Sequence, residues 1–230
     1  MIVSRTIAIC GLAVLGNTVP ASAADVSGNV GMVSDYRVRG ISLSEGRPAL
    51  QAALNLEHDS GIYAGIWTST IRDGHNTATE MDFYAGYEIQ LSDQSGFDLL
   101  TTYYVYPSDG GSNYFETAAT FNLSRDNLEA SLGVSWVPPQ SATKDDSGRL
   151  RGNFYYFYQV AVELPGTPVK LNLGGGFERG FFDESNSGGK LDWSLGVEYT
   201  LPPARVSIAF VGSDAKSQGE SLVAAIFYDF

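Results

Sequence analysis

The strongest constraint on this chain is an alternation of apolar and polar residues with a period of two, which recurs along most of the sequence. In residues 79–90, for example, Met81 and Phe83 alternate with Glu80 and Asp82. Successive side chains of a β-strand point to opposite faces of the sheet, so a segment of this kind forms a strand with one apolar and one polar face. The pattern therefore predicts an all-β protein.

The spacing of these segments predicts how the strands are connected. About twelve of them occur, in residues 26–39, 49–58, 62–71, 79–90, 97–106, 114–123, 128–137, 154–164, 169–179, 191–201, 205–213 and 221–230. Short connections alternate with longer polar ones, such as residues 138–152. An even number of strands with short turns at one end and long loops at the other is typical of bacterial outer-membrane barrels. We therefore expect a transmembrane antiparallel up-and-down β-barrel of about 12 strands, with short periplasmic turns, longer extracellular loops and both termini in the periplasm.

A soluble β-sandwich would also alternate, but it would hide its apolar face inside the protein. Here the polar face carries charged residues in the middle of strands together with many glycines, as a water-filled lumen requires. Large aromatic residues fall near strand ends on the apolar face, as in the two aromatic girdles of a membrane barrel. The expected girdle residues are Tyr36, Tyr103, Trp136, Tyr156 and Trp193 near the long loops, and Tyr87, Phe121, Tyr199, Tyr228 and Phe230 near the short turns. These features favour the membrane barrel.

The start of the chain has the features of an export signal. Arg5 precedes an apolar run in residues 7–15, and the small residues Ala21-Ser22-Ala23 follow it. This order predicts a secretory signal peptide that is cleaved after Ala23. Residues 1–23 are then the signal peptide, and residues 24–230 are the outer-membrane barrel domain.

The end of the chain places Leu222, Ala224, Ile226, Tyr228 and Phe230 at every second position. This arrangement resembles the C-terminal signal that the barrel-assembly machinery recognises in outer-membrane barrels. We therefore expect Tyr228 and Phe230 to act as an assembly signal. The expected partners are the assembly machinery and outer-membrane lipid.

Charge and cysteine content argue against several classes of protein. The chain has 14 Lys and Arg against 26 Asp and Glu, which argues against nucleic acid as a partner. The single cysteine, Cys10, lies in the predicted signal peptide, so the mature chain has neither a disulfide nor a thiolate site. The acidic pairs Asp145-Asp146 and Asp183-Glu184 lack the spacing of a calcium-binding loop. We therefore expect no metal site and no cofactor.

Three stretches resemble a known family: SDYRVRGIS in residues 34–42, RPALQ in residues 47–51 and SGIYAGIWTS in residues 60–69. They are similar to a TorF-like family of bacterial porins, which is also described as a conserved bacterial domain of unknown function. The resemblance implies an outer-membrane barrel and passage of solutes. It implies no particular substrate and no catalytic residues.

Assigning the polar face of each strand to the lumen gives the candidate site. The inward charged residues are then Asp35, Glu57, Glu80, Asp82, Glu88, Asp98, Glu116, Glu129, Glu163, Glu178, Asp192, Glu198 and Asp229, with Arg37, Arg39, Lys170 and Arg205. The residues expected to contact a solute are Asp35, Arg37, Arg39, Glu80, Asp82, Glu116 and Asp192. An excess of carboxylates in a confined channel favours cations. The sequence therefore predicts a porin-like channel for passive passage of ions or small solutes, with a modest preference for cations.

The arginines of residues 34–42 have two possible roles. Asp35, Arg37 and Arg39 share the lumen face of the predicted first strand, with Tyr36 and Val38 toward lipid. The two arginines either form structural ion pairs across strands or contact the solute. Their expected ion-pair partners are Glu57 and Asp229.

Two other functions stay open at this point. A plugged structural or adhesive barrel is compatible with tyrosines on the lumen face, namely Tyr63, Tyr84, Tyr104 and Tyr155. A hydrolase has less support, because the two histidines, His58 and His75, fall at opposite ends of the predicted barrel and no serine has a nucleophile-elbow setting. We therefore expect that the chain is not an enzyme.

Overall fold

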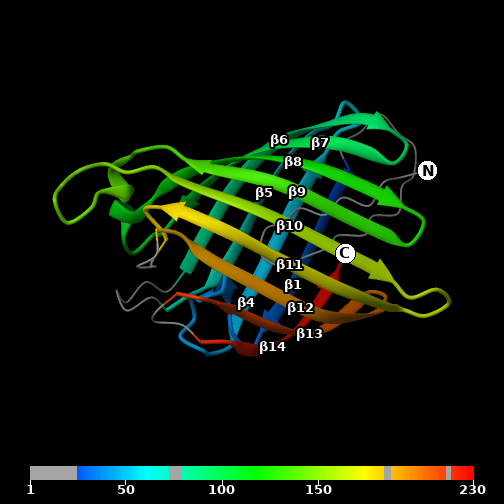
Figure 1. Cartoon of the computed structure of the whole chain (residues 1–230). Helices are drawn as coiled ribbons and strands as arrows, with labels where there is room; N and C mark the ends of the chain where they lie inside the picture. The colour runs from blue at the N-terminus through cyan, green and yellow to red at the C-terminus, as the bar shows by residue number, and fades with distance from the viewer. Residues whose placement is uncertain (1–24, 73–78, 184–187, 216–218) are drawn as a thin grey trace.

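A computed structural model describes residues 25–72, 79–183, 188–215 and 219–230 of the chain. Within these residues, twelve antiparallel strands close into a barrel in the order β1-β14-β13-β12-β11-β10-β9-β8-β7-β6-β5-β4 (Figure 1). The barrel strands are β1 (Asp25–Val33), β4 (Ala49–Glu57), β5 (Ile62–Thr70), β6 (Thr79–Ser92), β7 (Ser95–Val105), β8 (Tyr114–Arg125), β9 (Leu128–Val137), β10 (Asn153–Glu163), β11 (Val169–Gly180), β12 (Lys190–Leu201), β13 (Ala204–Ser213) and β14 (Ser221–Asp229). A separate two-stranded sheet is formed by β2 (Arg37–Val38) and β3 (Ile41–Ser42). The predicted all-β barrel is confirmed.

The barrel closes where its first and last strands meet, a pairing that we call the seam. β1 pairs with β14 at five positions, from Asn29↔Asp229 to Val33↔Ala225. On its other edge, β1 pairs with β4 at nine positions. Two hydrogen bonds extend the seam beyond β1: Ser34 N–H donates to the Ala224 carbonyl at 2.8 Å, and Ala224 N–H donates to Ser34 Oγ at 2.9 Å.

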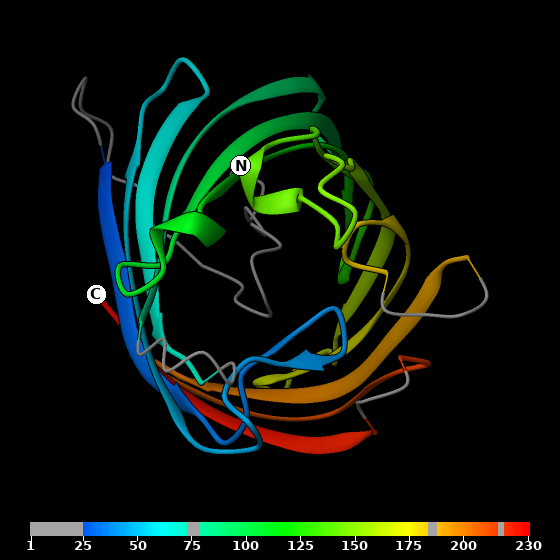
Figure 2. The same cartoon turned by 90° about the vertical axis from the view of Figure 1, so that its left-hand side faces the viewer.

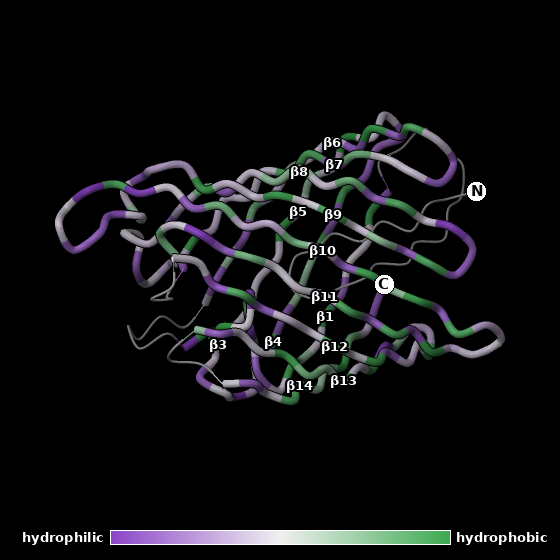
Figure 3. Tube along the Cα trace, in the orientation of Figure 1, coloured by the Kyte–Doolittle hydropathy of each residue, from purple (hydrophilic) through white to green (hydrophobic). Residues whose placement is uncertain are grey.

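Each strand turns one face outward and the other into the lumen, as the alternation predicts. On β6, Phe83 and Tyr87 are exposed on the outer surface, whereas Glu80 and Asp82 are buried inside the barrel. An outer surface of this kind matches the apolar band that a membrane barrel presents to lipid. Figure 3 shows hydrophobic stretches along the strands and hydrophilic colour concentrated in the connections at both ends.

The connections gather by length at the two ends of the barrel. Figure 1 shows short turns at one end and long loops at the other. The long loops contain two short helical segments, η1 (Gly110–Ser112) and η2 (Ser141–Thr143). In the described ranges, no helix has the length and apolar character that crossing a bilayer requires.

Most of the predicted girdle aromatics lie on the outer surface. Trp136, Tyr156, Tyr87, Tyr199, Tyr228 and Phe230 are exposed, and Tyr103, Phe121 and Trp193 are partly exposed. The outward rings also contact one another across strands, as between Tyr103 and Phe115, whose ring centroids lie 4.3 Å apart. Tyr36 is the exception, because it is only 4% exposed and lies inside the barrel.

The prediction of a first strand in residues 26–39 is wrong at its end. β1 stops at Val33, and the following residues leave the wall and fold into the lumen (Figure 2). Tyr36 and Val38 therefore do not face lipid as predicted, and both pack with the apolar residues inside the barrel. The predicted signal peptide, residues 1–23, lies outside the described residues and stays a prediction.

Candidate functional site in the barrel lumen

Residues 34–48, which we call the lumen hairpin, fold back inside the barrel instead of extending its wall (Figure 2). β2 and β3 pair at Val38↔Ile41, so Arg39 and Gly40 form a two-residue turn between them. Both turn residues have positive φ, 50° at Arg39 and 80° at Gly40, as in a type I′ hairpin turn. A non-glycine residue in this conformation costs about 1 kcal/mol, so the turn itself does not favour an arginine.

A carboxylate organises the base of the lumen hairpin. Asp35 accepts hydrogen bonds from Arg37 Nε at 2.5 Å, from Ser42 Oγ at 2.5 Å and from Ser44 Oγ at 3.1 Å. Ser44 Oγ in turn accepts a hydrogen bond from the N–H of Tyr36 at 2.8 Å. These bonds connect the two arms of the hairpin, so it is a structured element.

One side of the lumen is packed with apolar side chains, and the hairpin rests on it. The ring of Tyr36 packs on that of Trp67, with 5.3 Å between the ring centroids, and Trp67 is only 3% exposed. The buried cluster around them consists of Val33, Tyr36, Ala49, Tyr63, Trp67, Ile71, Tyr84 and Phe227. We call this side, formed by β14, β1, β4, β5 and β6, the filled half.

The tip of the hairpin crosses to the opposite wall, where Arg39 meets four side chains. Its guanidinium donates to Glu116 at 2.6 Å, to Glu178 at 2.6 Å and to Ser135 Oγ at 3.1 Å. It also lies over the ring of Tyr155, with Cζ 4.2 Å from the ring centroid. The charge-assisted hydrogen bonds to the carboxylates and the cation–π contact stabilise the guanidinium at this place in the lumen.

Lys190, which was not among the predicted lumen residues, supports the contact between Arg39 and Glu178. Lys190 Nζ lies 2.6 Å from a carboxylate oxygen of Glu178 and donates to the backbone carbonyl of Arg39 at 3.1 Å. Its side chain is 2% exposed. The signal was present in the sequence, because Leu191 faces outward and its neighbour Lys190 must then face inward.

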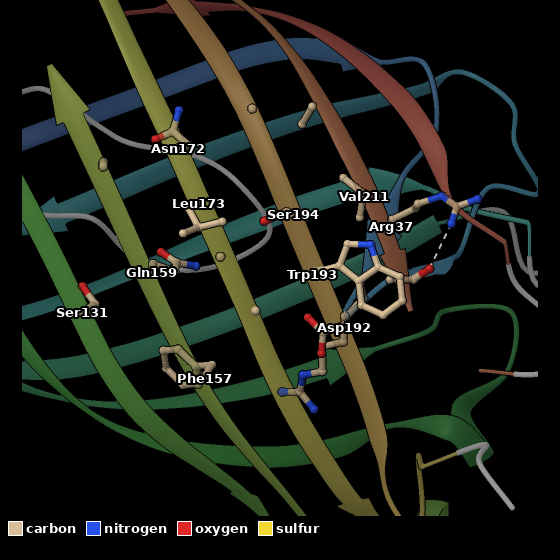
Figure 4. Close-up of a pocket in the computed structure, with 18 of the residues that line it drawn as sticks. Arg37, Ser131, Phe157, Gln159, Asn172, Leu173, Asp192, Trp193, Ser194 and Val211 are labelled. Carbon is tan, nitrogen blue, oxygen red and sulfur yellow. Dashed lines mark hydrogen bonds between the residues drawn. The ribbon is translucent and has the colours of Figure 1, made fainter. Parts of the chain in front are cut away.

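Beside the hairpin, the lumen holds a cavity of about 390 Å³. Most of the wall around it is formed by β8, β9, β10, β11, β12 and β13, which we call the open half. This wall contributes small or polar side chains such as Ser131, Gln159, Asn172 and Ser194 (Figure 4). The apolar cluster of the filled half thus borders the cavity, to which Val33, Tyr36 and Phe227 contribute, while the open half forms most of the cavity wall.

Glycines keep the aromatic residues of the open half close to the wall. A Cβ at Gly133 would lie 2.3 Å from the ring of Phe157, and a Cβ at Gly176 would lie 2.3 Å from the ring of Tyr155. These rings therefore pack directly on the backbone of the neighbouring strands. The cavity stays open although large side chains point inward.

A family model described as a bacterial protein of unknown function (Gcw_chp) matches residues 17–227. The chain belongs to this family. No curated protein sequence matches it.

Solved structures with a similar barrel are outer-membrane proteins. A NanC porin has a TM-score of 0.62 at 11% identity, with 90% of this chain and 99% of that chain covered. A KdgM porin has a TM-score of 0.60 at 7% identity, with 89% of this chain and 99% of that chain covered. An outer-membrane channel from Pseudomonas putida F1 has a TM-score of 0.57 at 8% identity, with 92% and 96% covered. At such low identities the likeness shows the fold, a 12-strand barrel of the kind found in outer-membrane porins.

In this Gcw_chp family member, the predicted lumen acids have different neighbours. Glu80 accepts a hydrogen bond from Tyr106 Oη at 2.9 Å, and Asp192 accepts one from Tyr155 Oη at 3.0 Å. Asp82 is buried, and within the described residues its two carboxylate oxygens have no hydrogen-bond partner. Contact of these residues with a solute stays a prediction.

The predicted ion-pair partners of the two arginines are wrong. Arg37 pairs with Asp35, and Arg39 pairs with Glu116 and Glu178 instead of Glu57 or Asp229. Asp229 pairs with Arg205, whose guanidinium also contacts Glu198. The prediction failed because it placed Arg39 in the wall, whereas the hairpin carries it across the lumen.

His58 and the pair Asp145-Asp146, which were considered for catalysis or metal binding, lie in connections between strands. His58 Nδ1 lies 2.9 Å from Ser60 Oγ in an exposed short turn, and His75 is outside the described residues. Asp145 lies in the long loop 138–152, where a hydrogen bond from the Ser147 hydroxyl and others from backbone N–H groups lower the pKa of its carboxyl group. The described ranges contain no cluster of three or more His, Cys, Asp or Glu residues that could hold a metal ion.

Proposed function

We propose that this chain is an outer-membrane channel for passive passage of ions or small solutes, with a modest preference for cations. The observation that supports this proposal most strongly is the lumen cavity, whose described lining includes seven acidic and three basic side chains. The sequence resemblance to TorF-like porins and the similarity of the barrel to two structures described as porins support this function.

The preference for cations follows from the charges that line the cavity. Carboxylates in a confined channel act on ions through an effective dielectric constant below that of bulk water, so an acidic excess attracts cations and repels anions. The preference is modest because several acids are paired, as Glu129 is with Lys170. Concentrated salt screens these charges and weakens the preference.

The same proposal includes the orientation and assembly of the barrel. Short turns and both termini lie in the periplasm, and the long loops lie outside the cell. Tyr228 and Phe230, which face outward from the end of the barrel, are the proposed recognition signal for the assembly machinery.

A reversal-potential measurement across a potassium chloride gradient in a planar lipid bilayer tests the proposal. Wild-type protein should conduct and prefer potassium over chloride. Asp192→Asn removes one charge from the cavity lining while keeping an acceptor for Tyr155, so the preference for potassium should fall. The control is Asp146→Asn in the exposed loop 138–152, which should change the preference less.

A plugged structural barrel is the second candidate, because the lumen hairpin and the apolar cluster occupy part of the lumen. Folded wild-type protein that inserts into the bilayer without any conductance would support this second function. Preference for chloride in the wild type would contradict the acidic channel.

A further inference from the structure

The contacts of Arg39 resemble those of a bound ligand more than those of a local hairpin residue. Glu116 lies on β8, Ser135 on β9, Tyr155 on β10 and Glu178 on β11, so four consecutive strands of the open half contribute one side chain each. We call these four residues the guanidinium cradle. All of them belong to the wall, and the lumen hairpin supplies only the cation that lies among them.

The cradle has the chemistry that recognises a planar cation. Two carboxylates accept hydrogen bonds from different edges of the guanidinium, and the ring of Tyr155 lies against its face. A guanidinium matches this set of planar donors and a ring face better than an ammonium, whose charge is compact and strongly hydrated.

The net charge of the cradle also matches one monovalent cation. Glu116 and Glu178 contribute two negative charges, and Lys190 compensates one of them through its contact with Glu178. Asp192, which accepts a hydrogen bond from Tyr155, adds to the acidic surroundings. Without Arg39, the two cradle carboxylates and Lys190 together would therefore keep one uncompensated negative charge inside the barrel. A single guanidinium group neutralises it.

The cradle is next to the cavity from which a solute would approach. Glu116, Ser135 and Tyr155 line that cavity, as does Arg39 itself. Arg39 reaches the cradle from a turn position with positive φ, where its own backbone does not favour an arginine. The contacts with the wall, and not the conformation of the turn, therefore favour an arginine at this position.

We propose that the guanidinium cradle is a binding site for solutes that carry a guanidinium group, and that Arg39 occupies the site and competes with them. This inference rests on the proposed channel function, which gives such solutes access from the cavity. A tethered side chain competes at an effective concentration of about millimolar or higher. Wild-type protein should therefore bind a guanidinium solute weakly, and removal of Arg39 should strengthen the binding at least about tenfold.

The test compares methylguanidinium with methylammonium on folded, detergent-solubilised protein and on single channels in potassium chloride. In Arg39→Ala, methylguanidinium should bind in calorimetry and block the current saturably at concentrations at least about tenfold below those needed in wild type. Methylammonium, which has the same charge, should bind and block more weakly. Adding Glu116→Gln to Arg39→Ala should abolish the difference between the two cations.

Two further variants complete the experiment. Arg179→Ala removes an exposed arginine of the outer face and should behave as wild type. Arg39→Lys keeps a weaker tethered cation and should give intermediate binding, which also allows the test if Arg39→Ala does not fold. Folding of each variant is checked by its heat-dependent gel mobility.

The outcomes separate this inference from the channel function. Suppose that Arg39→Ala conducts potassium chloride but is blocked equally by methylguanidinium and methylammonium, or is blocked by methylguanidinium no more strongly than wild type. The cradle is then not a guanidinium site, although the channel function is supported. If no variant conducts, the channel function fails, and calorimetry alone then decides on the cradle. Binding of methylguanidinium by Arg39→Ala that Glu116→Gln removes supports the site, whereas absence of binding overturns it.

Discussion

The filled half and the open half of the barrel follow the same strand pattern but differ in what they point inward. The filled half places Tyr63, Trp67 and Tyr84 in a buried apolar cluster. The open half places residues such as Asn172 and Ser194 along a cavity. Alternation therefore determines which residues face the lumen, whereas the size and polarity of those residues determine whether the lumen is filled.

The two halves also hold the lumen hairpin in different ways. Tyr36 attaches it to the filled half through packing with Trp67. Arg39 attaches it to the open half through ion pairs with Glu116 and Glu178. Apolar packing fixes where the hairpin rests, while the ion pairs fix how far its tip extends across the lumen.

The largest expected loss of stability comes from removing the apolar packing between Tyr36 and Trp67. Trp67→Ala deletes a buried indole that packs on Tyr36, and it should lower the free energy of unfolding by about 3–5 kcal/mol. Urea unfolding of protein refolded in lipid vesicles measures the loss. The matched control is Trp136→Ala, whose ring is 43% exposed on the outer surface and leaves no internal cavity. Equal losses in the two variants would contradict the distinction between filled lumen and outer surface.

A smaller loss in the free energy of unfolding is expected when a polar contact at the tip of the hairpin is removed. Lys190→Ala removes one partner of a buried ion pair and should cost about 3 kcal/mol, at the low end for such pairs, because Arg39 still contacts Glu178. The same unfolding experiment measures it. Lys144→Ala in the exposed loop 138–152 serves as the control and should stay within about 0.5 kcal/mol of wild type. A Lys190→Ala loss as small as that of the control would mean that the contacts of Lys190 with Glu178 and Arg39 do not stabilise the hairpin.

The smallest effect is expected in the part of the open half that lines the cavity. Gln159→Ala shortens a side chain beside the cavity, where water can replace the amide, so the free energy of unfolding should change by about 0.5 kcal/mol or less. Single-channel conductance should stay equal or rise slightly, because the cavity becomes wider. A destabilisation comparable to that of Trp67→Ala would show that the open half is packed as tightly as the filled half.

The strands could be predicted from the sequence because one periodic rule governs all of them. Lipid on one side and a wet lumen on the other require alternation over the full strand, and turn residues interrupt it at each end. The predicted 128–137 matches β9, and the predicted 191–201 differs from β12 by one residue. Lys190 is that residue, and its omission removed a buried cation from the predicted site.

The lumen hairpin could not be predicted because its sequence continues the alternation of β1. Residues 34–39 keep a period of two, which fits a wall strand and a hairpin arm equally well. What separates the two cases is the contact of Tyr36 with Trp67 and of Arg39 with Glu178, which are far apart in the sequence. A local pattern contains no information about partners at such separations.

The contacts between the lumen hairpin and the last strand bear on when the hairpin reaches its final position during assembly of the barrel. Ser34 bonds to Ala224 of the last strand, and Arg37 donates to the Gly219 carbonyl at 2.7 Å just before that strand. The other anchors of the hairpin, on β5, β8, β9, β10, β11 and β12, also come later in the chain than the hairpin itself. The full set of hairpin contacts therefore exists only when the final strand is in place, so the lumen reaches its final shape only in the fully assembled protein.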